Sequence, residues 1–474
     1  MDDHALPGYH IFALPVFDRF LLYSPFHTFA ALVNRASVSQ LQRRLLAGSE
    51  TVAEPLKQIL ETFQSYGDPR PSRKEARFVP PFLGLVTTRA CDLACKYCGF
   101  WNGNDPGTTM SLKLVRDSVD WYLDLVCQAG QPDAQIHFFG GEPFSAEEVV
   151  DFAMHYARAR AAGSGLAVRF EVATNGTFSQ ERCQWVADCF DTVVLSLDGP
   201  ADVHNFHRPK RGGQGSFEIV TRNAGILSEG QAALCLRACV TRDTVNRMEE
   251  IAHWFCETFH PQSVCFETLQ PTTQSEAAGL YPPDPWLFAR NFIRAAEVLE
   301  AWGVEPVYAT ADIRARRITF CPVGQDVAIV SPDGTLAACY LLRRDWEAQG
   351  LDLRLGNIDA CGNVSLDLNA VESIRGMNML NRPSCECCFC RWHCAGGCYV
   401  HHRLPGLPGS YDRLCIQARV IALWNILKAM RQEDLARRLL QDSTALEAAV
   451  WQCTDRLCDL RSGGDQAGRL ARSC

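Results

Sequence analysis

The sequence predicts an α/β protein: a partial (β/α)6 TIM-like barrel followed by a small cysteine-rich domain, with a small N-terminal α+β segment. Three observations lead to this prediction. Six short apolar runs alternate with helical patterns between residues 82 and 270, as in a parallel βα sheet or barrel. After about residue 310 the alternation stops and cysteines become dense. At 474 residues, the chain is also too long for one ordinary domain.

The first segment, residues 1–77, contains two strand-like runs, His10–Val16 and Arg19–Tyr23, and then an amphipathic stretch from Ser37 to Tyr66. A break rich in proline and charge, Asp68–Arg77, follows it. This order is compatible with a module that binds a peptide as an added strand. An extension that only supports the barrel would have the same pattern. The start has neither a basic nor an apolar signal region, so we expect no signal peptide.

The second segment, residues 78–310, is the predicted barrel. Its expected strands are Leu83–Thr87, Gln135–Phe139, Ala167–Ala173, Thr192–Leu197, Cys235–Thr241 and Ser263–Thr268. Its expected helices are Leu112–Gln128, Ala146–Ala161, Gln180–Phe190, Phe217–Ser228 and Val245–Phe259. Loops at the carboxyl ends of such strands carry the chemistry in these folds. The loops after the first four strands contain Cys91, Cys95 and Cys98; Gly140-Gly141-Glu142-Pro143; Thr174-Asn175-Gly176; and Asp198-Gly199-Pro200.

Composition narrows the possible functions. A net charge of -8 gives no support for binding nucleic acid or an anionic membrane. No apolar run reaches the length of about 18 residues that suggests a membrane span. Without an export signal, 23 cysteines are not expected to form disulfides, because the cytosol keeps thiols reduced. We therefore expect a cytoplasmic protein whose clustered cysteines bind metal.

Cys91, Cys95 and Cys98 are the first such cluster. Three thiolates at this spacing can bind three corners of a [4Fe–4S] cube, for which thiolates are the preferred soft ligands. The fourth iron then stays open and can chelate the amino and carboxylate groups of S-adenosylmethionine (SAM). A zinc site is the alternative, although zinc usually takes a fourth N or S donor and CxxC pairs.

Because Tyr97 precedes the last cysteine, the motif resembles that of the radical SAM superfamily. The resemblance covers about residues 82–270 and includes the three later loops. It implies that Tyr97 lies near the adenine of SAM, and that the Gly140-Gly141-Glu142 segment meets the SAM amino group. Further implied SAM contacts are Asn175 near the ribose, and Ser196 and Arg237 near the carboxylate. Arg237 could equally line the barrel, and His137 and Glu267 lie near the same rim without an assigned role.

Seven cysteines in the third segment, residues 311–425, resemble those of the SPASM domain, which carries two auxiliary [4Fe–4S] clusters. The resemblance implies one cluster on Cys321, Cys339 and Cys398, and a second on Cys385, Cys388, Cys394 and Cys415. A cysteine-rich zinc module is the alternative. The loop-rich composition predicts a domain held by metal rather than by a large core.

Two departures from the family pattern stand out. Some relatives complete the first auxiliary cluster with a cysteine shortly before the position of Cys321, and none lies between Cys265 and Cys321 here. That cluster would keep an open iron or borrow a non-cysteine donor or one of Cys361, Cys387 and Cys390. Tyr340 stands where anaerobic sulfatase maturases carry an acidic residue, which weakens the case for that activity.

The resemblance implies an enzyme that cleaves SAM reductively to a 5′-deoxyadenosyl radical and abstracts hydrogen from a peptide or protein side chain. The product would be a crosslink, a thioether or an oxidised residue. Expected partners are a peptide or protein substrate with a leader or recognition segment, and an electron donor such as flavodoxin or ferredoxin. Two alternatives stay open: a SPASM-type dehydrogenase of a small molecule, and a non-catalytic iron–sulfur scaffold or electron carrier. The last segment, residues 426–474, is predicted as a helical tail.

Overall fold

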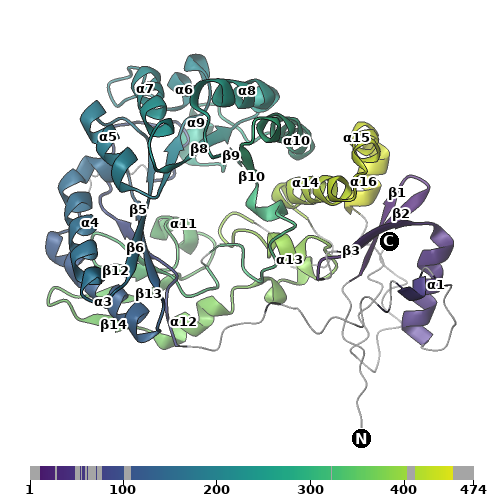
Figure 1. The fold of residues 1–474 in the computed structure, drawn as a ribbon, viewed down its shortest axis with the longest axis horizontal. Coiled ribbons are helices and arrows are strands. Elements are labelled where there is room, and N and C mark those ends of the chain that lie inside the picture. The colour runs from purple at the N-terminus through teal and green to yellow at the C-terminus, as the bar shows by residue number, and fades with distance from the viewer. Residues whose placement is uncertain are drawn as a thin grey trace, which may run out of the picture.

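A curved sheet with helices on its outer side organises the computed structural model (Figure 1). The structure describes residues 11–26, 29–47, 77–100, 108–321, 323–402 and 411–451, and a few single positions between 54 and 71. The six predicted barrel strands are β4 Leu83–Val86, β5 Asp133–Phe139, β6 Ala167–Thr174, β7 Thr192–Ser196, β8 Ala233–Val240 and β9 Ser263–Thr268. They are parallel and adjacent in chain order. The predicted α/β class with a parallel-strand sheet is thus confirmed.

The helices between these strands begin and end close to the predicted positions. They are α3 Leu112–Gln128, α4 Glu147–Ala162, α5 Gln180–Cys189, α7 Phe217–Ser228 and α8 Met248–Phe259. Three further helices, α6 Ala201–His207, α9 Thr273–Ala277 and α10 Pro285–Ala301, were not predicted. The start of α10 carries a readable signal, because Asp284 caps the amide of Leu287 and proline occupies the first turn.

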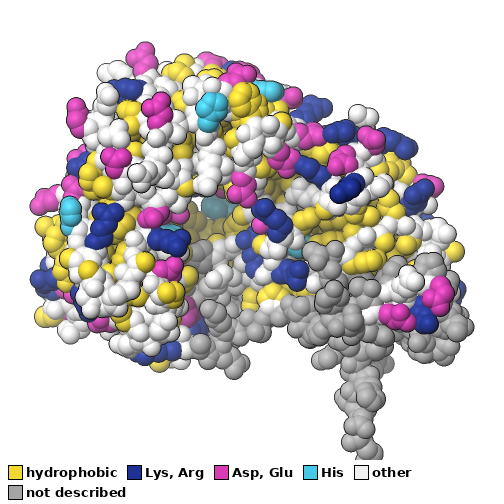
Figure 2. Space-filling model, viewed as in Figure 1, with side chains coloured by type: hydrophobic (Ala, Val, Ile, Leu, Met, Phe, Trp, Pro, Cys, Tyr) yellow, Lys and Arg dark blue, Asp and Glu magenta, His cyan; other side chains and the backbone are white. Residues whose placement is uncertain are grey.

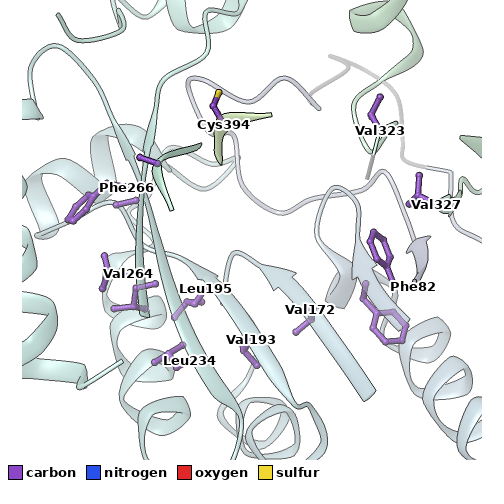
Figure 3. Close-up of a cluster of buried hydrophobic side chains, with 14 of the residues drawn as sticks. Phe82, Val172, Val193, Leu195, Leu234, Val264, Phe266, Val323, Val327 and Cys394 are labelled. Carbon is purple, nitrogen blue, oxygen red and sulfur yellow. The ribbon is translucent and has the colours of Figure 1, made fainter. Parts of the chain in front are cut away.

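Alternation along the strands separates a buried face from the barrel interior. Side chains such as Val193, Leu195, Leu234, Val264 and Phe266 are buried, and their neighbours in the chain face the other way (Figure 3). The positions between them include polar residues such as His137, Glu171 and Arg237, which are partly buried or exposed. The residues between the buried ones are free to line a site inside the barrel.

The cysteine-rich region extends the same sheet. Strand β11, Ala328–Val330, pairs in parallel with β4, and β12 Thr335–Ala337, β13 Arg354–Ile358 and β14 Val364–Leu366 follow as antiparallel neighbours. Val330, Leu336 and Leu355 join the main hydrophobic core. These strands bury apolar side chains continuously with the barrel, so the region has more of a hydrophobic core than expected. That metal also holds it stays a prediction.

Helices complete this end of the molecule. They are α11 Arg343–Glu347, α12 Leu368–Arg375, α13 Arg391–Cys394, α14 Arg413–Ala429, α15 Glu433–Gln441 and α16 Ser443–Trp451. Helix α14 packs on α10 and runs across the predicted boundary at residues 425 and 426. The predicted divisions at 77, 310 and 425 stay predictions. No helix in the described ranges has the length and apolar character needed to cross a membrane.

The N-terminal segment is a three-stranded antiparallel sheet followed by helix α1, Arg35–Ala47. Its strands are β1 Phe12–Val16, β2 Arg19–Ser24 and β3 Phe29–Val33, of which the third was not predicted. Strand β1 packs against α16, so the N-terminal sheet lies beside the C-terminal helices (Figure 1). Phe26 meets Trp392 edge-on, with ring centroids 4.5 Å apart.

Candidate functional site

The first cysteine cluster lies on the loop after β4, at the predicted rim. Cys91, Cys95 and Cys98 are partly buried free thiols. Two amides of this loop donate to carbonyls at the end of α6: Ala94 N to Pro209 O at 2.8 Å, and Lys96 N to His207 O at 2.9 Å. The loop is thus held by backbone contacts on the far side of the rim, which fixes where the three thiols lie.

Gly140 and Gly141 allow the second loop to press against the cysteine loop. The amide of Gly141 donates to Thr88 O at 2.9 Å. A Cβ atom would lie 2.3 Å from Thr88 O if placed on Gly140, and 2.2 Å from Ala90 O if placed on Gly141. No side chain fits at these distances, so glycine is required here by the packing of two loops. The expected approach to the SAM amino group stays a prediction.

Glu142 ties the second loop to the third. It is 3% exposed, and its Oε1 accepts from Thr174 Oγ1 at 2.7 Å and from the Phe144 amide at 3.2 Å. Its Oε2 accepts from the Asn175 amide at 2.7 Å. Burial raises the pKa of Glu142 to about 7, although these hydrogen bonds oppose the rise. Two carboxylate oxygens can accept about four hydrogen bonds, so capacity remains for a cationic ligand.

Asn175 lies against the cysteine loop. Its Nδ2 donates to Asp92 Oδ1 at 2.9 Å and lies 3.6 Å from Cys91 Sγ. Thr177 Oγ1 donates to the other Asp92 oxygen at 2.5 Å. These contacts orient Cys91 and direct an N–H group at its sulfur, a contact that tunes iron–sulfur clusters. The ribose contact expected of Asn175 stays a prediction.

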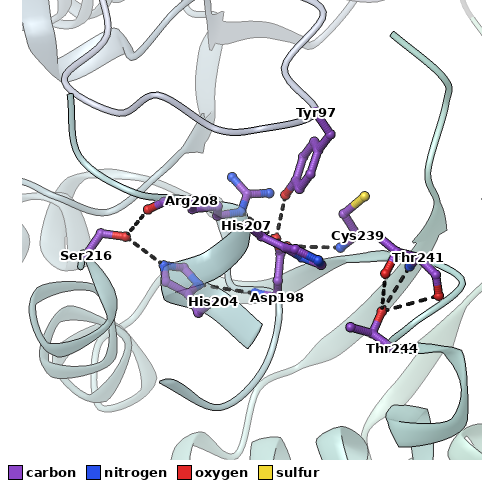
Figure 4. Close-up of polar contacts among 9 residues, drawn as sticks. All are labelled: Tyr97, Asp198, His204, His207, Arg208, Ser216, Cys239, Thr241 and Thr244. Atoms are coloured by element: carbon purple, nitrogen blue, oxygen red, sulfur yellow. Dashed lines mark hydrogen bonds and ion pairs between the residues drawn. The ribbon is translucent and has the colours of Figure 1, made fainter. Parts of the chain in front are cut away.

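Tyr97 is held by a buried carboxylate, Asp198 (Figure 4). The Tyr97 hydroxyl donates to Asp198 Oδ2 at 2.6 Å. The same oxygen lies 3.1 Å from His207 Nδ1 and 3.0 Å from Arg208 Nε. The other oxygen accepts from the Cys239 amide at 3.0 Å. Asp198 therefore joins the cysteine loop, the loop after β7, the end of α6 and strand β8.

This carboxylate is ionised in its buried position. Burial alone raises the pKa of Asp198, but the Arg208 guanidinium and the hydrogen bond from His207 together hold it well below its usual range. Sequence reasoning noted Asp198 only as part of the loop after the fourth strand, which resembles a SAM-contacting loop, and missed Arg208 and His207. The available signal was the polar cluster His204, His207 and Arg208 just after Asp198-Gly199-Pro200.

Ser196 and Arg237 are neighbours across strands β7 and β8. The Arg237 guanidinium lies 3.7 Å from Glu267 Oε1, and these side chains are 46% and 48% exposed. Arg237 and Glu267 both lie on the strand face that lines the barrel interior. Arg237 thus has Glu267 as a partner inside the barrel, as the barrel-lining alternative requires. Ser196 lies half-buried beside Arg237. Contacts of either residue with SAM stay predictions.

His137 lies at the inner wall of the barrel. Its ring stacks on Phe82 with centroids 4.1 Å apart, and its Nδ1 lies 3.8 Å from Glu171 Oε1. Burial lowers the pKa of His137 to about 4, so the imidazole is neutral near pH 7. This supports the interpretation of His137 as a packed barrel histidine.

Tyr340 also packs on this wall. Its ring lies 4.6 Å from that of Phe139, and its hydroxyl fills the space beside Gly84, where a Cβ would lie 2.5 Å from it. Burial raises the pKa of Tyr340 well above its usual value, so the phenol stays neutral. A cavity of about 90 Å³ opens between Tyr340, Cys339 and the two glycines of the second loop. Its lining combines the loop after β5 with residues of the cysteine-rich region.

Cys321, Cys339 and Cys398 lie close together in that region. Burial, and then charge on the neighbouring thiols, raises the pKa of Cys321 and of Cys339. Three other cysteines were candidates to complete the set: Cys361, Cys387 and Cys390. Cys361 is exposed in a turn beside Asp117 of α3, and Cys390 lines a different cavity. The fourth donor therefore remains unassigned.

Cys385, Cys388, Cys394 and Cys415 line one cavity. Their backbone positions come from η5 (Pro383–Cys385), the turn after it, the end of α13 and the first turn of α14. Four thiols that converge on one small cavity are the donor set of a [4Fe–4S] cluster, so these residues fit that group. Cys390 and Arg419 line the same cavity, and sequence reasoning did not assign either residue to this site.

Comparison with known proteins identifies the family of the barrel domain. Residues 85–255 match the radical SAM superfamily. The chain carries a radical SAM domain. The serine-type anaerobic sulfatase-maturating enzyme of Klebsiella aerogenes is 23% identical over 368 residues, which cover 72% of this chain and 86% of that protein.

Two solved structures share the fold of this chain. Native anSMEcpe with bound AdoMet and the Cp18Cys peptide has a TM-score of 0.58 at 19% identity, covering 76% of this chain and 100% of that one. Streptococcus suis SuiB bound to the precursor peptide SuiA has a TM-score of 0.51 at 14% identity, covering 86% and 99%. These structures confirm the predicted fold, and the match of residues 85–255 confirms the predicted radical SAM domain, whereas the individual SAM and cluster contacts stay predictions.

Proposed function

We propose that this radical SAM protein is a maturase that abstracts a hydrogen atom from a peptide or protein side chain. The convergence of the loops after β4, β5, β6 and β7 on three free thiols carries this proposal. Relatives named for sulfatase maturation, and neighbours bound to a substrate or precursor peptide, support a peptide or protein as the substrate. A non-catalytic scaffold would have no need of loops packed so closely around the cysteines.

Cys91, Cys95 and Cys98 would hold the SAM-binding [4Fe–4S] cluster, with Tyr97, Gly140, Gly141, Glu142, Asn175, Ser196 and Arg237 around SAM. When bound, the cluster and SAM supply the electron and the 5′-deoxyadenosyl radical, which are the cofactors' own chemistry. The chain supplies orientation: Asn175 fixes Cys91 at a 3.6 Å contact, and Asp198 fixes Tyr97. A flavodoxin or ferredoxin would deliver the electron.

The two groups of thiols in the cysteine-rich region would hold two auxiliary [4Fe–4S] clusters, one on Cys321, Cys339 and Cys398 and one on Cys385, Cys388, Cys394 and Cys415. All twenty cysteines in the described ranges are free thiols, as expected for a protein of the reducing cytoplasm. Figure 2 shows acidic and basic side chains interspersed on the visible face. This distribution gives no support for a nucleic-acid partner.

The barrel interior would receive the substrate side chain. Arg237 and Glu267 are half-exposed there and can pair with polar groups of a peptide. Tyr340 offers a neutral phenol where sulfatase maturases have an acidic residue, so we propose a peptide other than a sulfatase. Residues 1–77 would bind a leader: β2 is paired on both sides, β1 packs on α16, and β3 is an edge strand.

The test begins with anaerobic reconstitution, an iron and sulfide count, and an assay of 5′-deoxyadenosine formation with dithionite. About twelve irons per chain are expected from three clusters. Cys95→Ala should abolish SAM cleavage and keep the auxiliary iron, whereas Cys127→Ala, an exposed thiol on α3, should change neither. Zinc without SAM cleavage in the parent protein would refute the enzyme.

The substrate is tested by co-expression with a short peptide encoded beside the gene, followed by mass spectrometry. A loss of two hydrogens would indicate a crosslink, a thioether or an oxidation. Absence of any change in mass or stereochemistry, together with turnover of an added small alcohol or aminosugar, would favour the small-molecule dehydrogenase instead.

A further inference from the structure

Arg419 is a buried cation at the wall of the second cysteine cavity. It lies on α14 and is 1% exposed. Its Nη1 donates to Cys388 Sγ at 2.8 Å, and its Nε donates to Val450 O at 2.7 Å. The guanidinium lies between two aromatic rings, 4.7 Å from the Phe389 centroid and 4.2 Å from that of Tyr411. These contacts fix one orientation of the side chain.

A buried cation needs a negative partner, because its transfer from water costs several kcal/mol. Arg375 shows the usual solution: it is 8% exposed and forms two 2.7 Å contacts with the carboxylate of Asp326. Arg419 has no such carboxylate among the residues that the structure describes, and the groups that favour its charge are Cys388, Tyr411 and Cys390. Its Nη2 is buried without a hydrogen-bond partner. The cavity must therefore supply the negative charge.

We infer that Arg419 is the counter-cation of the auxiliary cluster that Cys388 ligates, and that it raises the reduction potential of that cluster. The inference rests on the proposed function, which places a cluster in this cavity. A cluster bound by four thiolates is anionic and gains a further negative charge on reduction. A fixed positive charge with an N–H group aimed at a ligand sulfur stabilises the reduced form more than the oxidised form.

Arg419 is therefore a positioning residue that acts through Cys388. The first auxiliary group differs in this respect, because no hydrogen bond to the sulfur of Cys321, Cys339 or Cys398 is found from a buried arginine in the described ranges. We expect the two auxiliary clusters to have different potentials, with the one on Cys388 more easily reduced. That order would direct an electron toward the cavity beside α14.

The test measures potentials in the full chain. A parent variant with Cys91, Cys95 and Cys98 replaced by Ala removes the signal of the SAM-binding cluster. Arg419→Gln and Arg419→Lys are added to it, with Arg375→Lys as the matched control for loss of a buried arginine. Each protein is reconstituted anaerobically, counted for iron and sulfide, and titrated with dithionite under EPR detection. The auxiliary cluster on Cys321 serves as the internal reference.

Arg419→Gln should lower one midpoint potential by about 59 mV or more, a tenfold or greater change in the one-electron reduction equilibrium. Arg419→Lys should give a smaller shift of the same sign, and Arg375→Lys should give none. Unchanged potentials with full iron content would overturn the inference. Loss of the second cluster's iron in both Arg419 variants, with iron kept in the control, would also overturn it by making Arg419 a structural residue. Absence of auxiliary iron in the parent would instead refute the proposed clusters.

Discussion

Replacement of Asp198 by Asn should destabilise the protein strongly. Asp198 has no exposed side-chain surface, and it is the carboxylate that faces the Arg208 guanidinium at 3.0 Å. Removing one partner of a buried pair leaves the other charge uncompensated and costs about 3–5 kcal/mol. That is a large part of the roughly 5–15 kcal/mol that stabilises a typical domain. Tyr97 would also lose the ionised acceptor that holds it beside the cysteine loop.

The assay is urea unfolding of the anaerobically reconstituted protein, followed by tryptophan fluorescence. Asp202→Asn is the matched control, since Asp202 lies only four residues further along the chain, at the start of α6, but its side chain is 68% exposed in its pair with Arg247. The control should cost under about 1 kcal/mol. The double variant Asp198→Asn with Arg208→Met should lose less unfolding free energy than the sum of the two single variants, because the unpaired guanidinium is removed together with its carboxylate. A loss no larger than that of the control would refute the reasoning.

The loss in the free energy of unfolding caused by Asp198→Asn should not depend on pH between 5 and 8. The folded-state pKa of Asp198 is depressed, so its contribution is present above the unfolded pKa and is lost only as pH falls through the folded pKa, well below this window. Unfolding measured at pH 5.5, 6.5 and 7.5 should therefore give the same difference between the two proteins. A difference that grows steadily across that range would contradict this expectation and show that Asp198 or a histidine in contact with it titrates there.

Three further changes test other parts of the structure. Gly141→Ala should abolish iron incorporation at the first cluster, since the new Cβ would lie 2.2 Å from Ala90 O. In the control Gly225→Ala on α7, the new Cβ meets nothing within 4 Å, so the iron count should not change. The free energy of unfolding of the wild-type protein should fall by up to about 3 kcal/mol as pH falls from 6.5 toward 4, because burial penalises protonation of His137. In His137→Asn, urea unfolding should show a weaker dependence of this free energy on pH. Phe26→Ala should cost about 3–5 kcal/mol by leaving a cavity against Trp392, while Leu368→Ala, at 67% exposure, should cost little; equal melting temperatures would contradict this.

The periodicity of the sequence predicted β4 to β9 well because buried parallel strands give long apolar runs. It did not predict β11, β12 and β14, since three residues are too short to show a period of two. The cysteines could be proposed as ligands because most of them lie in short, closely spaced motifs, and their roles stay predictions. Cys235, Cys239 and Cys265 lie in apolar stretches of the sequence, yet they are only partly buried, on strand faces that line the barrel.

The polar partners of the site were harder to predict because their contacts are long-range. Tyr97 and Asp198 are separated by 101 residues, and no local pattern relates them. Arg419 lies inside the apolar run from Ile416 to Leu427, and a charge in such a run was the available signal. A sequence shows that this charge will be buried, but the thiol that compensates it comes from another segment. Tertiary structure is needed to join the two.

Buried contacts join the N-terminal sheet to the wall of the second cysteine cavity. Tyr23 on β2 hydrogen-bonds His393 Nε2, while His393 Nδ1 donates to Ala315 O at 2.8 Å, which fixes the tautomer so that Nε2 accepts from the phenol. Burial lowers the pKa of His393, which keeps the ring neutral and this arrangement intact. The next residue, Cys394, lines the cavity. If β3 binds a peptide and Cys394 ligates a cluster, as proposed, the helix that contacts the N-terminal sheet would also supply a cluster ligand. The orientation of the substrate and the integrity of the cluster would then depend on one set of buried contacts.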